Sequence, residues 1–202
     1  MYIVSSYVRA VGHHRRYYFY ELIRDDFELR RGFVSELHDV YFARLAQELD
    51  EHGDVLLPGP GKIHAVNAEV SLKDWTSEER EELYQSISLL VISKEFADFD
   101  PRNDSWILFQ FAENRFGSPS GKAQLEQAID AIVDCATNPD AGQTDLYQIA
   151  KNVAEDSEIA SGRIFALQPG IFGVSVDLVE IASRLRSMIA ARGRRIGSID
   201  RE

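Results

Sequence analysis

The chain has little cysteine, little lysine and no long apolar run, and each shortage bears on its class of protein or its origin. Its 202 residues include one cysteine, Cys135, which excludes an intramolecular disulfide and favours a reducing compartment. No stretch reaches the roughly 18 consecutive apolar residues that a membrane-spanning helix needs, and residues 1–10 lack a signal-peptide pattern. We therefore expect a soluble, cytoplasmic protein. The 17 arginines against 5 lysines suggest a GC-rich bacterial coding sequence.

Negative charge is what the chain has in excess, and it is unevenly placed. The formal net charge is −11. Residues 21–181 carry 13 basic against 31 acidic side chains, a net of −18, whereas residues 1–20 carry +3 and residues 182–202 carry +4. The basic ends either lie against the acidic body or offer a contact patch to an anionic partner. An acidic body suits a partner with a basic surface.

Composition and periodicity predict one α+β domain spanning residues 1–202, with a frayed basic tail after residue 194. The chain is 45% hydrophobic and 27% charged, which is ordinary for a globular protein. We expect a mainly antiparallel or mixed sheet with an N-terminal hairpin, packed by about five helices. The tight Pro-Gly-Pro-Gly sequence predicts a loop over 53–62. The predicted strands, rich in β-branched and aromatic residues, are 2–11 and 16–24 (the hairpin), a weak 27–30, 63–72, 106–111 and 163–167.

The helices are predicted from apolar residues spaced three and four apart. The clearest covers 33–51, and a second begins at a capping box formed by Thr76 and Glu79. The apolar stretch 87–93 is either the buried end of that second helix or a separate strand, because periodicity does not separate the two. Further helices are predicted over 122–136, 144–154 and from about 175 to 192.

A catalytic cysteine and histidine pair would have to come from Cys135 and His52. The two must converge in space for the imidazole to generate a thiolate. Cys135 falls at the C-terminal end of its predicted helix, where the helix dipole disfavours a thiolate. We therefore favour a buried, apolar role for Cys135, with a hydrolase built on these two residues or on dispersed residues as an alternative.

No cofactor or metal site is expected. The sequence from Gly117 to Lys122 resembles a phosphate-binding loop in position only, since one residue is missing from the spacing and Ala123 replaces the hydroxyl that binds Mg²⁺. His13 and His14 would point to opposite faces of a strand. His38 and His64 have no nearby His or Cys partner that would complete a zinc site.

The strongest binding feature is an aromatic run beside two arginines, Arg15 and Arg16. If the run is one strand of a hairpin, alternate rings pack on the core and the other half can be exposed. Exposed rings with arginine are typical of interfaces. The candidate binding residues are Arg15, Arg16, Tyr18 and Tyr20.

The sequence thus favours a non-enzymatic, macromolecule-binding protein of a regulatory, inhibitor or immunity type, whose partner is a protein with a basic surface. Two alternatives stay open. One is the hydrolase, and the other is nucleic-acid binding through the basic ends, which the net acidity disfavours.

Overall fold

The computed structural model describes residues 2–8, 14–23, 31–84, 87–111, 118–137, 146–147 and 173–177. A six-stranded sheet forms its centre, in the order β1-β3-β2-β4-β5-β6. Every pair of neighbours is parallel except the two pairs that β4 makes, with β2 and with β5. The strands are β1 Tyr2–Val4, β2 Tyr17–Leu22, β3 Gly53–Pro58, β4 Ile87–Ile92, β5 Trp106–Phe111 and β6 Gly173–Asp177.

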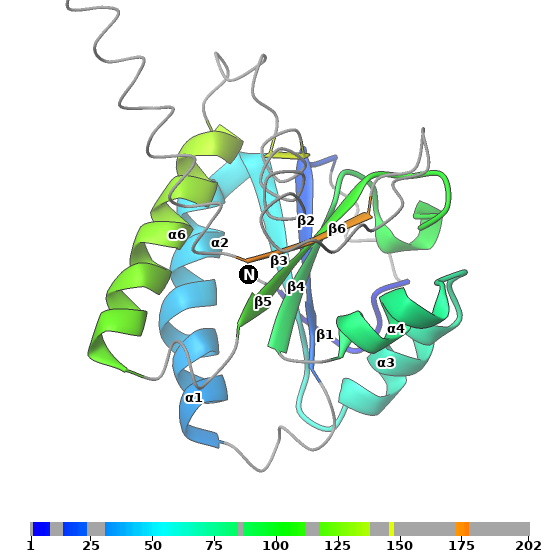
Figure 1. The fold of residues 1–202 in the computed structure, drawn as a ribbon, viewed down its shortest axis with the longest axis horizontal. Helices are drawn as coiled ribbons and strands as arrows, with labels where there is room; N and C mark the ends of the chain where they lie inside the picture. The colour runs from blue at the N-terminus through cyan, green and yellow to red at the C-terminus, as the bar shows by residue number, and fades with distance from the viewer. Residues whose placement is uncertain are drawn as a thin grey trace, which may run out of the picture.

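Helices cover both faces of the sheet (Figure 1). One face carries α1 Arg31–Glu36, the π-helix Leu37–Phe42, α2 Ala43–Leu49 and the long α6 Pro119–Thr137. The other carries α3 Ile63–Ser71 and α4 Ser77–Leu83. Short 3₁₀ turns lie at Asp50–His52 and Phe96–Asp98. None of the described helices is long and apolar enough to cross a membrane.

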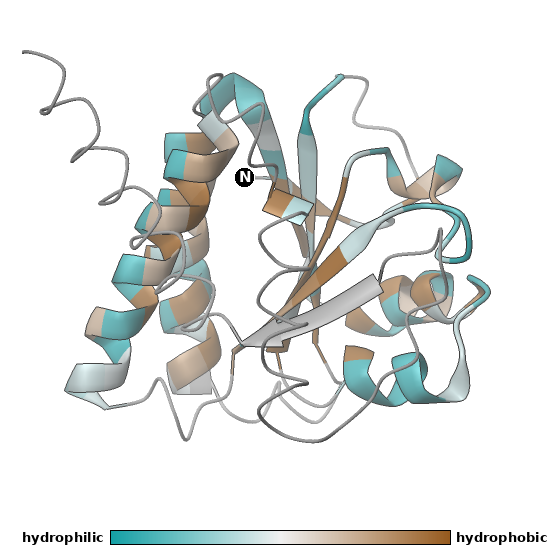
Figure 2. Cartoon of the chain, turned by 45° about the horizontal axis from the view of Figure 1, so that its top comes forward, coloured by the Kyte–Doolittle hydropathy of each residue, from teal (hydrophilic) through white to brown (hydrophobic). Residues whose placement is uncertain are grey.

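The central strands are buried on both faces, so the sheet separates two apolar cores. Odd-numbered residues of β2, such as Tyr17 and Phe19, pack toward α1, α2 and α6, while Tyr18 and Tyr20 pack toward α3 and α4. This follows from the alternation of side chains along a strand. The hydropathy colouring shows polar residues on the outer surfaces of the helices that enclose these cores (Figure 2). Fully burying one large apolar side chain in either core stabilises the fold by roughly 1.5–3 kcal/mol.

An α+β fold with a mixed sheet is confirmed, but the predicted N-terminal hairpin is wrong. β3 lies between β1 and β2 and pairs with both in parallel. The connection from β2 to β3 runs through α1 and α2, which is a βαβ crossover. Counting the continuous segment 31–49 as one, the described residues contain four α-helices, one fewer than expected.

Three further predictions were wrong in whole or in part. The stretch predicted as a loop over 53–62 contains β3, and only its second half turns, with the amide of Lys62 donating to the carbonyl of Gly59. The stretch predicted as a strand over 63–72 is α3, whose Val66 and Val70 are fully buried one helical turn apart. The strand Gly173–Asp177 likewise replaces the predicted start of the last helix.

Other predictions were correct. The helix over 33–51 and the strand 106–111 are present, and the helix predicted over 122–136 is α6. The capping box of Thr76 and Glu79 forms both of its hydrogen bonds. The stretch over 87–93, for which a helix end and a strand were both possible, contains the strand β4. The predicted elements 27–30 and 163–167, most of 144–154 and the tail after 194 lie outside the described residues.

Candidate functional site

A buried glutamate lies near the carboxyl end of β2. Glu21 is 0% exposed and faces the side of the sheet that α1, the π-helix and α6 cover. It is buried because β2 is a central strand with helices over both faces. The parallel strands β1, β2, β3 and β5 all end at this edge, and ligands of open α/β sheets bind at such carboxyl edges.

The partner of Glu21 is His38, from the first turn of the π-helix Leu37–Phe42. Its Nε2 lies 2.5 Å from Glu21 Oε1, and the ring is 28% exposed, so it joins the buried carboxylate to the surface. The π-helix sits between two α-helical segments with ordinary helical dihedral angles at both ends. Single π-helical turns inside α-helices frequently mark functional sites.

The electrostatics favour a charged His38. Burial alone would lower the pKa of His38, but the hydrogen bond and negative charge of Glu21, with a smaller effect from Asp39, raise it above 6.5. The second oxygen, Glu21 Oε2, is buried and has no hydrogen-bond partner among the described residues. The main-chain carbonyl of Glu21 accepts a hydrogen bond from the buried Tyr7 hydroxyl, which fixes the strand at this position.

A second buried acid, Asp54, lies at the opposite end of the sheet and engages one of the predicted binding residues. Arg15 Nε is 3.3 Å from Asp54 Oδ1, and Arg15 Nη1 donates to the carbonyl of Glu51 at 3.2 Å. Burial would lower the pKa of Arg15, but Asp54 raises it. The guanidinium of Arg16 lies 5.2 Å from the centre of the Tyr17 ring.

The half of the aromatic run that a surface hairpin could have exposed is buried. Tyr18 and Tyr20 are 2% and 1% exposed, because β2 is a central strand and not one arm of a surface hairpin. The Tyr18 hydroxyl accepts from the amide of Arg15, and the Tyr20 hydroxyl accepts from the buried amide of Phe96. The predicted role of Arg15, Arg16, Tyr18 and Tyr20 in binding a partner stays a prediction.

The other candidates from the sequence take structural positions. Cys135 is a buried residue of α6, and His52 lies in the 3₁₀ turn that follows α2. At the start of α6 the Ser118 hydroxyl accepts from the amide of Gly121, and Lys122 pairs with Glu36 at 2.6 Å. Within the described part of the chain, no group of three or more His, Cys, Asp or Glu side chains could hold a metal ion.

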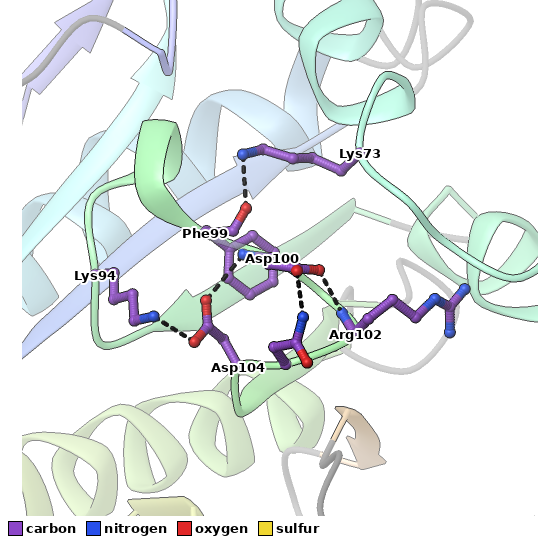
Figure 3. Close-up of polar contacts among 7 residues, drawn as sticks. Lys73, Lys94, Phe99, Asp100, Arg102 and Asp104 are labelled. Atoms are coloured by element: carbon purple, nitrogen blue, oxygen red, sulfur yellow. Dashed lines mark hydrogen bonds and ion pairs between the residues drawn. The ribbon is translucent and has the colours of Figure 1, made fainter.

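The connection between β4 and β5 forms a turn that is held by several side-chain hydrogen bonds (Figure 3). Asp100 accepts from the amide of Arg102 at 2.9 Å and from Asn103, and these bonds lower the pKa of Asp100. Asp104 in turn accepts from the amide of Asp100 and pairs with Lys94. The turn is thereby closed by its own side chains.

Two cations fasten this turn to the segment between α3 and α4. Lys73 Nζ donates to the carbonyl of Phe99 at 2.6 Å. Arg102 reaches Asp74 at 3.6 Å and Glu79 at 3.3 Å. The β4–β5 connection is therefore bonded to the segment between α3 and α4 and to the first turn of α4.

The outer surface of α3 and α4 is acidic and carries an exposed apolar stripe. The stripe consists of Ala65, Ala68 and Leu72, which are three and four residues apart, and Leu72 is 86% exposed. Residues 63–84 contain six acidic and two basic side chains, a net of −4. We call this surface the acidic face; its exposed acids include Asp74, Glu78 and Glu81.

Sequence reasoning missed both the Glu21–His38 pair and the acidic face. No protein family, curated protein or solved structure matches the chain.

Proposed function

We propose that the protein binds a basic macromolecular partner, most simply another protein, through the acidic face of α3 and α4. The observation that carries this proposal is Leu72. Its side chain is 86% exposed, the most exposed of the large hydrophobic residues in the described part of the chain. A leucine so exposed at the C-terminal end of α3 contributes little to the stability of the free protein, whereas burial against a partner would contribute roughly 1.5–3 kcal/mol.

Charge supports a basic partner. Glu78 and Glu81 are exposed and form no ion pair with the described residues, so both can meet cations from outside. Of the two basic side chains in residues 63–84, Lys73 is turned inward onto the carbonyl of Phe99 and Arg80 is exposed, so the surface keeps an excess of acidic side chains. Complementary charge of this kind speeds association and selects the partner.

Rigidity supports the same surface. The capping box at Thr76 fixes the start of α4, and Arg102 joins Asp74 and Glu79 to the β4–β5 turn. A surface that is already ordered loses less conformational entropy when it binds.

The test begins with capture of the partner from the native cell, followed by purification of that partner and calorimetric titration. Leu72→Ser and the charge reversal Glu78→Lys/Glu81→Lys should each weaken binding at least fivefold. Val40→Ser and Glu126→Lys are matched controls, because Val40 is 51% exposed and Glu126 is exposed on helices of the opposite face. Unchanged affinity in the Leu72 and Glu78/Glu81 variants would refute the proposal.

A hydrolase with dispersed residues is the second candidate, and the Glu21–His38 pair is the observation that favours it. A buried carboxylate that orients an imidazole is the arrangement of a general acid–base group. Among the described residues, however, His38 has no hydrogen bond to a hydroxyl or thiol that it could activate. Screening with activated esters would support this candidate if turnover disappears in His38→Gln and persists in His64→Gln.

A further inference from the structure

Three features meet at Glu21 and His38, and the proposed binding function uses none of them. Glu21 is fully buried with one oxygen unpartnered among the described residues. The only described side chain that pairs with its other oxygen belongs to His38, whose ring is partly open to water. That histidine lies on a π-helical turn, which is a rare and less regular form of helix.

Among the described residues, His38 is the one cation that can compensate the negative charge of Glu21. The strands facing this side of the sheet supply apolar side chains, and on its own helix the titratable neighbour is Asp39, which is exposed and bonded to Ser35. From α6, the nearby Lys122 is already paired with Glu36. Leu89 of β4 lies opposite Glu21 in the register, and it belongs to the apolar core on this side of the sheet.

We infer that the His38–Glu21 pair is a proton-operated latch, in which protonated His38 fastens the π-helical turn Leu37–Phe42 to β2 and loss of that proton releases it. An unpaired carboxylate in an apolar site is strongly unfavourable. When His38 becomes neutral, the attraction weakens, and the turn can open so that water reaches Glu21. The ring is already 28% exposed, so it has a path to solvent.

The direction of the pH effect follows from the pKa of His38, which Glu21 raises above 6.5 in the closed form. In the open form the ring is solvated and its pKa returns toward about 6.5. The stabilisation is therefore complete below about pH 6.5 and is lost as the pH rises from there to the pKa of the closed form. Within that window the closed-to-open ratio falls about tenfold per pH unit, and above it the ratio levels off.

Amide hydrogen exchange of the wild-type chain between pH 6 and 9, corrected for the intrinsic rate, tests the latch. Protection of amides in 37–42 should fall about tenfold per pH unit and then level off, while protection in α3 and in the C-terminal half of α6 stays constant. His38→Gln should remove this pH dependence. His64→Gln, a matched change at an exposed histidine of α3, should retain it.

Equal pH dependence in wild type and His38→Gln would overturn the latch, as would a uniform loss of protection over the whole sheet. If His38→Gln does not fold, the ring of His38 and the amide of Phe42 can be titrated by NMR in the wild-type chain. The latch requires a common midpoint for the two signals, and separate midpoints would overturn it. Neither outcome depends on the partner that the acidic face binds.

Discussion

Replacing His38 by leucine removes the one described partner of a fully buried carboxylate and leaves Glu21 without compensation. Removing one member of a buried ion pair costs roughly 3–5 kcal/mol. Because His38 is 28% exposed, water can enter and solvate part of the charge, so we expect the lower end, about 3 kcal/mol. For a chain of 202 residues, this corresponds to a fall in melting temperature of roughly 6–12 °C.

The double variant Glu21→Leu/His38→Leu decides whether charge is the cause. It replaces the pair by apolar side chains beside Phe42, whose ring centre lies 6.0 Å from that of His38. Buried pairs replaced in this way are often no less stable than before, so we expect the double variant within about 1 kcal/mol of wild type.

Urea unfolding followed by tryptophan fluorescence measures all variants of this cycle, since Trp75 and Trp106 are both buried in the opposite core. The reasoning predicts a favourable coupling energy of about 2 kcal/mol or more between the two sites. If the single changes are simply additive, so that the double variant is the least stable of the set, the pair does not act as a compensated charge and the reasoning is refuted.

Three further changes test other parts of the structure by the same unfolding assay. Tyr20→Phe removes the acceptor for the buried amide of Phe96 and should cost about 1–2 kcal/mol; no change would mean that another group satisfies this amide. Gly61→Ala places a side chain at φ +69° in open space, so the backbone alone should cost about 1 kcal/mol, and a stabilised variant would contradict that conformation. Thr76→Ala breaks the capping box and should cost about 1 kcal/mol, whereas Ser77→Ala, one residue later, should cost much less.

The sequence predicted those elements whose local signals agree with their packing. The helix over 33–51 and the capping box at Thr76 rest on contacts between residues close in sequence, which periodicity captures. The π-helical turn within the first helix left no such signal. Its position is set by tertiary contacts, among them the bond from His38 to a strand 17 residues earlier.

The hairpin and β3 were mispredicted for one shared reason. β3 pairs with β1 and β2 in parallel. Parallel partners are joined by a crossover and not by a tight turn, so turn signals cannot reveal the pairing. The Pro-Gly-Pro-Gly sequence favoured a loop over the whole of 53–62, although the short apolar run over 55–57 that precedes it forms the centre of β3. For 63–72, the β-branched residues favoured a strand, whereas the spacing of Val66 and Val70 favoured the helix that packing selects.

The sequence contained a signal that Glu21 is buried, but the run around it was interpreted as one strand of a surface hairpin. The run Tyr17–Ile23 is apolar at nearly every position, which is typical of a strand covered on both faces. Read in that way, it would have placed Glu21 in the interior, where an acid needs a partner. The identity of that partner could not be predicted, because His38 is brought to it by a crossover helix.

The measurement that tests the proposed function most directly is the affinity of the purified partner for the wild-type chain, Leu72→Ser and Val40→Ser at low and physiological salt. The account predicts that affinity falls with salt, because charge contributes to binding, and that Leu72→Ser weakens binding at both salt concentrations while Val40→Ser does not. Binding that is insensitive to Leu72→Ser but lost in Val40→Ser would place the interface on the opposite face of the molecule and contradict the account.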